Sequence, residues 1–260
     1  MAGAIPSLAQ NRTVFDISHI NFEEQEYVEL AGNWDFYWMQ LVNPDQVYRT
    51  QPDTLLSFTT NWATVDGYSP TGYGSYSAMV VLPESHPVLA LDLPDFYSSY
   101  VLYVNGEEFA RNGVVATSRA AYTPKWLPQT ISLGGMQSDT LRLLLQVANF
   151  DHAKGGAYLP IKIGSSRSLF LQRYLDYGYS FILTGALLMG GMFFFGLYLF
   201  GRHETTVLYF SLFCIVYSYR IIGFGSYALH MVVPELPWIL TLRLEYITLF
   251  LSGYIFGMYT

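Results

Sequence analysis

Residues 177–201, YGYSFILTGALLMGGMFFFGLYLFG, are 25 consecutive positions without a charged side chain. An α-helix rises 1.5 Å per residue, so about 20 apolar residues cross a hydrocarbon core roughly 30 Å thick. The glycines of this stretch would weaken a helix in water, but in lipid small residues are where helices approach closely. The stretch therefore predicts a transmembrane helix rather than a buried helix of a soluble protein.

Two more apolar stretches follow, separated by short polar links. The second runs from Thr205 to about Leu229, and the third from Trp238 to Thr260. Only 15 residues follow Glu245, about 22 Å of helix, which is short of a full crossing. We therefore interpret residues 177–260 as three membrane helices, the third incomplete, in a chain that is a fragment of a longer protein.

Charged residues are rare inside these stretches. Arg220 falls near the end of the second stretch, and Glu245 falls near the start of the third, so both are expected at the same membrane face. Ionisable groups at such depth pair with one another or extend to the interface. Arg220 and Glu245 are predicted to form an intramembrane ion pair, and independent snorkelling of each side chain is the alternative.

The net charge divides the chain in the same place. Residues 1–176 contain ten Lys or Arg and seventeen Asp or Glu, whereas residues 177–260 contain three of each. An acidic first region argues against a nucleic-acid partner, which requires a basic face. The single cysteine, Cys214, allows no intrachain disulfide, and no signal peptide is visible at the start, so neither feature decides the compartment.

The first region has the pattern of short strands separated by turn residues. Asn33–Trp38 alternates aromatic side chains on one face, and Asn105-Gly106 is a strong hairpin signal because both residues tolerate positive φ. Further strands are expected at residues 73–82, 88–93, 100–104, 107–110, 129–133, 141–148 and 159–163. Eight or nine strands without a convincing helix predict an all-β sandwich of jelly-roll, galactose-binding-like type, followed by transmembrane α-helices.

Four segments result from this reading. Residues 1–24 are an N-terminal extension, residues 25–164 the β-sandwich, residues 165–176 a juxtamembrane connector and residues 177–260 the membrane helices. The connector has helical spacing in Leu169, Arg173 and Asp176 and contains no Pro or Gly. A stiff helix nearly continuous with the first span is expected there, and it would pass motion of the β domain to the membrane.

Several motifs occur in an order that resembles a known family. They are Leu30-Ala31-Gly32-Asn33-Trp34-Asp35-Phe36-Tyr37, Gly72-Tyr73-Gly74-Ser75-Tyr76, Pro94-Asp95-Phe96-Tyr97-Ser98-Ser99-Tyr100, Leu102-Tyr103-Val104-Asn105-Gly106 and Asn149-Phe150-Asp151-His152 with Gly155-Gly156. Over roughly residues 25–260 the chain resembles bacterial seven-transmembrane receptors with diverse intracellular signalling modules. Their extracellular β domain is similar to the sugar-binding domain of family 2 glycoside hydrolases.

The resemblance implies an exported β domain, periplasmic or extracellular, on the bacterial inner membrane. It also implies seven helices and a cytoplasmic output domain, of which this sequence contains only the first helices. The distribution of positive charge favours the opposite orientation, because Arg167 and Arg173 precede the first span and Arg202 alone follows it. That rule loses force for long translocated domains.

Carbohydrate sites combine aromatic faces with a few fixed polar groups. Candidate ligand-binding residues are Trp62, Tyr68, Tyr73, Tyr76, Tyr97, Trp126, Asn149 and His152. Each has core or turn packing as its alternative role, because aromatic residues also fill β-sheet cores.

The sequence favours a receptor that senses a carbohydrate-like or other small extracytoplasmic ligand. The alternatives are a structural module for dimer or partner contacts, and an accessory domain of a tethered enzyme. No spaced carboxylate pair, zinc-ligand spacing or nucleotide fingerprint is recognisable, so we expect no enzyme activity, metal or cofactor. Membrane lipid, a small ligand and a second copy of the chain are the expected partners.

Overall fold

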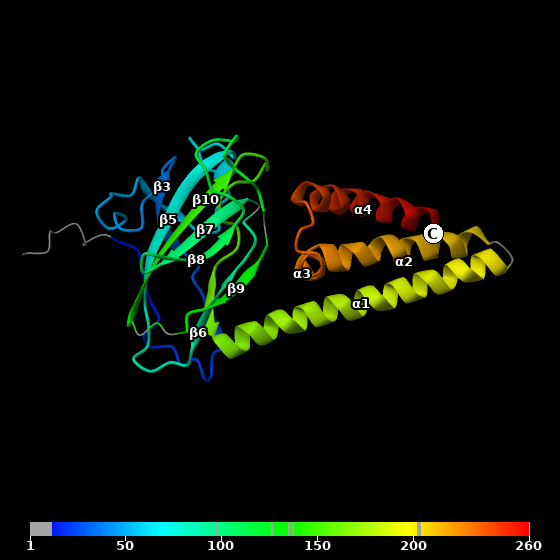
Figure 1. The fold of residues 1–260 in the computed structure, drawn as a ribbon, viewed down its shortest axis with the longest axis horizontal. Helices are drawn as coiled ribbons and strands as arrows, with labels where there is room; N and C mark the ends of the chain where they lie inside the picture. Colours follow the sequence, from blue (N-terminus) through cyan, green and yellow to red (C-terminus); the bar gives the residue numbers. More distant parts are fainter. Residues whose placement is uncertain are drawn as a thin grey trace, which may run out of the picture. The chain divides into compact units, whose positions relative to one another are not determined.

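The computed structural model describes residues 12–96, 98–125, 127–134, 136, 138–201 and 204–259. The chain forms two compact units, Met1–Phe170 and Leu171–Thr260. The first unit is a β-sandwich and the second is helical (Figure 1). The sequence-based expectation of a β-sandwich followed by three long apolar helices is thus confirmed.

The larger sheet has the order β4-β3-β5-β10-β7-β8, with β1 paired to β5 beside this path. Its strands are β1 (Val14–Asp16), β3 (Asn33–Trp38), β4 (Thr54–Ser57), β5 (Gly72–Val81), β7 (Ser99–Val104), β8 (Glu107–Asn112) and β10 (Thr140–Asn149). All pairs are antiparallel except β1 with β5. The ten-residue strands β5 and β10 pair over their full length and form the centre of the sheet.

The smaller sheet has the order β2-β11-β6-β9 and is antiparallel throughout. Its strands are β2 (Tyr27–Glu29), β6 (Leu89–Leu93), β9 (Gln129–Ser132) and β11 (Lys162–Ser165). A short 3₁₀ helix, η2 (Trp62–Thr64), lies in the connection from β4 to β5. Three short strands, β1, β2 and β4, were not predicted from the sequence, and β1 brings part of the expected N-terminal extension into the large sheet.

The core lies between the two sheets and is rich in aromatic rings. Phe36 and Tyr76 from the large sheet pack with their centroids 4.6 Å apart, and Trp34 stacks on Phe58 at 4.5 Å. Leu91 of the small sheet belongs to the same buried cluster. Alternate side chains along each strand point to opposite faces, so one face of each sheet supplies this core.

The outer face of the large sheet carries a second buried cluster. Tyr37 packs there with Val42 and Val47, and Arg12 forms an ion pair with Asp35 at 3.2 Å. The Arg12 and Asp35 side chains are only 8% and 1% exposed. Arg12 also donates to the Tyr37 hydroxyl at 2.6 Å. Removal of either charge would leave the other buried and unpaired, so this cluster fixes the N-terminal segment to the sheet.

The helical part of the chain contains α1 (Ser166–Phe200), α2 (Thr205–Gly223), α3 (Ala228–Val232) and α4 (Trp238–Tyr259). Helices α1, α2 and α4 are each long and apolar enough to cross a membrane. The third span, expected from Trp238 to Thr260 and expected to be incomplete, is described as a helix of 22 residues, about 33 Å long. The second predicted stretch divides into α2 and α3, since Gly225 and Tyr227 adopt positive φ.

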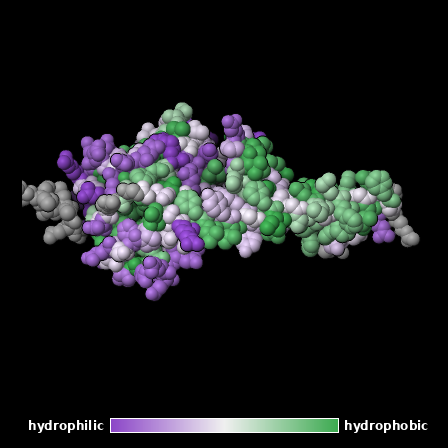
Figure 2. Space-filling model, turned by 60° about the horizontal axis from the view of Figure 1, so that its bottom comes forward, coloured by the Kyte–Doolittle hydropathy of each residue, from purple (hydrophilic) through white to green (hydrophobic). Residues whose placement is uncertain are grey.

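Small residues mediate the contact of α1 with α2. Ser211 donates to the carbonyl of Gly191 at 2.9 Å, and a Cβ at Gly191 would lie 2.8 Å from Ile215. Other surfaces of the helices carry large apolar side chains. Met189 on α1 is 75% exposed, and Phe250 on α4 is 73% exposed. Figure 2 shows hydrophobic residues over the visible helical surface and hydrophilic residues spread over that of the β-sandwich. This distribution suits helices surrounded by lipid.

The α1–α2 contact predicts a difference between two neighbouring glycines. Gly191→Val forces a side chain into Ile215 and should destabilise the helix pair by about 1–3 kcal/mol. Gly190→Val is the control, because a Cβ at Gly190 meets no described atom within 4 Å. The thermal unfolding midpoint in detergent should fall for Gly191→Val only, and equal midpoints for the two variants would contradict the helix packing.

Candidate functional site

One end of the sandwich gathers the connections that cross between the sheets. Asn149 pairs with Gly72, Ala148 with Ser99 and Tyr100 with Asn112, so β10 and β8 end where β5 and β7 begin. Three connections that cross between the sheets therefore meet there: residues 94–98, 113–128 and 150–161. Residues 60–71, which lead into β5, reach the same end. We call these four segments the loop end. Tyr97 and Trp126, two candidates from the sequence, belong to them but lie outside the described residues.

Asn149 organises this end through its side-chain amide. Its Nδ2 donates to the carbonyls of Pro70 at 2.8 Å, His152 at 2.8 Å and Lys154 at 3.1 Å. Its Oδ1 accepts the N–H groups of Asp151 and His152. Since Asn149 is fully buried, these bonds replace water and hold the two loops in one arrangement. Asn149 is thus placed as a brace of the candidate site.

Trp62 and Tyr76 lie beneath this loop. The Trp62 Nε1–H donates to the Tyr76 hydroxyl at 2.6 Å, and both side chains are fully buried. Burial raises the pKa of Tyr76 far above its usual value. Side chains at Gly155 or Gly156 would lie 2.6 Å from atoms of Trp62, so these positions accept only glycine. The structure gives Trp62 and Tyr76 a packing role, because neither ring has an exposed surface.

Tyr68, Tyr73 and His152 are partly exposed, but they do not share one face. Tyr68 packs on Trp38 with ring centroids 4.9 Å apart, at the edge of the core. Tyr73 lies on the opposite face of β5 from Tyr76, because side chains alternate along a strand. Tyr68 and His152 therefore belong to the loop end, and Tyr73 belongs to the outer surface beside it. The binding role of all three stays a prediction.

His152 is oriented by its own loop. The N–H of Lys154 donates to His152 Nδ1 at 3.0 Å, and the backbone of His152 is bonded to Asn149. Partial burial lowers the pKa of the imidazole. The backbone of this loop thus fixes the position of the ring through Nδ1.

Further polar groups at the loop end were not identified from the sequence. Arg119 forms an ion pair with Asp151 at 2.5 Å, and Tyr158 donates to Asp95 at 2.6 Å. Tyr122 packs edge-on against Phe150, and burial raises its pKa. The two polar contacts join positions 32 and 63 residues apart in the chain, so no local pattern could have indicated them.

The arrangement offers binding groups rather than a metal site. Aromatic edges, carboxylates, a guanidinium and an imidazole occur among these connections, and such groups can bind polar small molecules. Among the described residues, no group of three or more His, Cys, Asp or Glu side chains could hold a metal ion.

The predicted pair of Arg220 and Glu245 is found in contact between α2 and α4. Arg220 Nη1 donates to the backbone carbonyl of Glu245 at 3.1 Å. The guanidinium also lies 5.5 Å from the centroid of the Phe224 ring, a cation–π geometry. The contact that the structure shows between the two residues is therefore a hydrogen bond to the main chain.

No family model matches the chain, and no curated protein sequence matches it. Several solved glycosidases are similar to its β region. One is a GH2 β-galacturonidase from Eisenbergiella tayi, with 13% sequence identity and a TM-score of 0.39 over 54% of this chain and 24% of that enzyme. A second is a β-glucuronidase from Faecalibacterium prausnitzii, with 13% identity and a TM-score of 0.41 over 53% of this chain and 31% of the enzyme. A third is a β-glucuronidase from Bacteroides uniformis, with 15% identity and a TM-score of 0.42 over 53% of this chain and 17% of the enzyme. The chain thus spans less than a third of each enzyme, and similarity of this extent carries no argument about activity.

The brace formed by Asn149 can be tested by a nearly isosteric change. Asn149→Asp replaces the donating amide by a carboxylate oxygen that would face three carbonyls. We expect a loss of about 3 kcal/mol, which lowers the thermal midpoint of the β-sandwich by roughly 6–12 °C. Asn43→Asp is the matched control, since exposed Asn43 uses only its Oδ1, as acceptor for the Asp45 N–H, and aspartate keeps that acceptor. A similar midpoint for both variants would show that Asn149 does not hold the loops.

Proposed function

We propose that the chain is the sensing portion of a bacterial membrane receptor. Its β-sandwich binds an extracytoplasmic, carbohydrate-like ligand at the loop end, and α1 passes the resulting change to the membrane helices. The observation that carries this proposal is the continuity of α1, which begins directly after β11 and continues for 35 residues without a break. A helix of this length transmits displacement along its axis, whereas a flexible linker would absorb it.

The N-terminal turn of α1 is fixed to the sandwich. The N–H of Ser166 donates to the carbonyl of Val88 at 2.8 Å, and Leu169 is 2% exposed. The first turns of the helix are thereby fixed to strands β6 and β11. This anchoring supports a mechanical connection between the β domain and the helix that leaves it.

Ligand binding at the loop end is supported by its side chains. Tyr68 offers a partly exposed ring, and the other connections of the loop end offer the imidazole of His152 and the exposed guanidinium of Arg119. Sugars are bound by ring faces together with hydrogen bonds from fixed polar groups. The braced loops keep these groups in place before the ligand arrives, which lowers the entropy cost of binding.

The proposed activity is binding without catalysis. Glycoside hydrolysis requires two carboxyl groups facing one bond, at about 5 to 10 Å from each other. At the loop end Asp95 accepts from Tyr158 and Asp151 is paired with Arg119. Both carboxylates therefore have structural partners, which supports a binding role for this end of the sandwich.

The binding proposal can be tested with the whole chain in detergent on a glycan array. We expect at least one class of glycan to bind, and Tyr68→Ala to weaken that binding about tenfold, a loss near 1.4 kcal/mol. Tyr174→Ala, a change of an exposed tyrosine on α1, is the matched control and should bind normally. If no glycan or other small ligand binds, the structural module for dimer or partner contacts is favoured instead.

The proposed sidedness can be tested by labelling single cysteines in intact cells. In a Cys214→Ser background, Ser85→Cys marks an exposed position of the β-sandwich, and Glu204→Cys marks the exposed start of α2. A membrane-impermeant maleimide should label the first variant in intact cells and the second only after permeabilisation. The reverse pattern would place the β domain in the cytoplasm, as the arginine distribution alone favours.

A further inference from the structure

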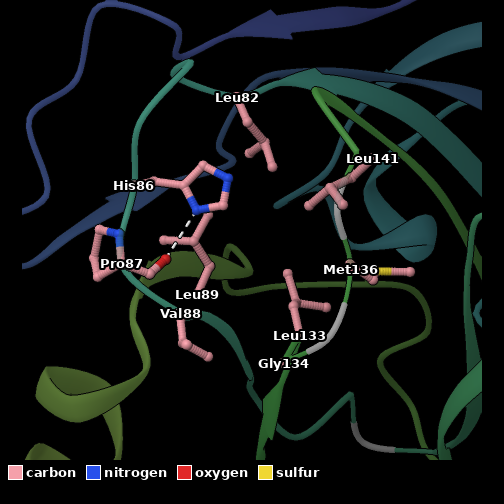
Figure 3. A pocket seen from close by; sticks show the side chains of 9 residues that line it. All are labelled: Leu82, His86, Pro87, Val88, Leu89, Leu133, Gly134, Met136 and Leu141. Atoms are coloured by element: carbon pink, nitrogen blue, oxygen red, sulfur yellow. Dashed lines mark hydrogen bonds between the residues drawn. The ribbon is translucent and has the colours of Figure 1, made fainter.

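A cavity of about 200 Å³ lies at the end of the β-sandwich opposite the loop end. Its residues come from the end of β5, the connection to β6, the end of β9 and the start of β10, where Val81 pairs with Thr140. The lining residues are Leu82, His86, Pro87, Val88, Leu89, Leu133, Gly134, Met136 and Leu141 (Figure 3). All four leucines belong to the main core, so the cavity is an opening into that core.

The side chains that line the cavity are apolar apart from the imidazole of His86. His86 Nδ1 lies 2.8 Å from the carbonyl of Pro87, which can only accept, so Nδ1 carries the proton. In the tautomer with the proton on Nδ1, Nε2 is the ring nitrogen that can accept a hydrogen bond. In Figure 3 the ring nitrogen that is not bonded to Pro87 points toward Leu82 and Leu141. The cavity thus combines apolar side chains with one side-chain acceptor.

We propose that this cavity is a binding site for a small, flat, apolar molecule that carries one hydrogen-bond donor, as a phenol does. An apolar cavity of about 150 Å³ is known to accept benzene, so the volume suits one aromatic ring with a substituent. Apolar contacts with the leucines would supply most of the affinity, and His86 Nε2 would select ligands with an O–H or N–H group. The site is separate from the loop end and takes a different class of ligand.

The cavity wall is also the point to which α1 is attached. Val88 lines the cavity, and its carbonyl accepts the N–H of Ser166, the first residue of α1. On the next residue, the carbonyl of Leu89 accepts the N–H of Leu133, another lining residue. A molecule that fills the cavity therefore contacts Val88, the residue whose carbonyl binds the N-terminus of α1. Binding in the cavity can influence the helix through this contact.

The test is a titration of the detergent-solubilised full chain, labelled with ¹³C in its methionine methyl groups. Met136 lines the cavity, and its signal is identified by its loss in Met136→Leu. Phenol and toluene are the probes, with their free aqueous concentrations measured at equilibrium. Phenol should shift the Met136 signal with saturation and bind about fivefold more tightly than toluene, as one net hydrogen bond predicts.

Two variants separate the cavity and its acceptor from general partitioning of the probes. Leu133→Phe fills the cavity and should abolish saturable shifts with both probes, and its thermal midpoint shows whether it folds. His86→Phe keeps a ring but lacks the acceptor, so phenol should bind it no better than toluene. A shift that never saturates, that persists in Leu133→Phe, or that favours phenol equally in His86→Phe would overturn the proposal.

Discussion

The need to shield three apolar helices from water is the constraint on which this structure depends. Side chains such as Met189 and Phe250 are about three-quarters exposed on the helical part of the chain, where water would make such surface costly. In a bilayer the same surface is favourable, and a helix satisfies its backbone polar groups internally except at its ends. The polar side chains follow this logic, since Ser211 and Thr184 are buried and donate to carbonyls of neighbouring helices. The proposals for sensing and for orientation both presuppose this membrane location.

Local sequence patterns predicted the strands, turns and helices whose formation depends mainly on residues close to one another in the chain. The alternation in Asn33–Trp38 gave β3, and Asn105-Gly106 gave the turn between β7 and β8, where both residues have positive φ. Long apolar stretches gave α1 and α4. The short strands β1 and β4 were missed, because three or four half-exposed residues have no distinct periodicity. Pairing with β5 and β3, which are distant in sequence, makes them strands.

The candidate site was only partly predictable for a related reason. Asn149 and His152 could be identified as a loop motif, but the carbonyl of Pro70, 79 residues away, could not be identified as a partner. Trp62 and Tyr76 have the residue types of both a sugar site and a core, and only the fold shows that they are buried. The Arg12–Asp35 pair was likewise invisible, since a buried charge has no sequence signature apart from its environment. The cavity beside His86 arises where residues 82–89 meet residues 133–141, about 45 to 60 residues apart in sequence, and has no local motif.

Membrane residence of the helices is tested most directly by reconstitution. The full chain is expressed, incorporated into lipid vesicles and washed with alkaline carbonate, and the protein in vesicles and supernatant is quantified. The account predicts that the protein stays with the vesicles, and that it aggregates when detergent is removed without lipid. Release into the supernatant, together with a monodisperse species in plain buffer, would contradict the membrane assignment and with it the proposed function.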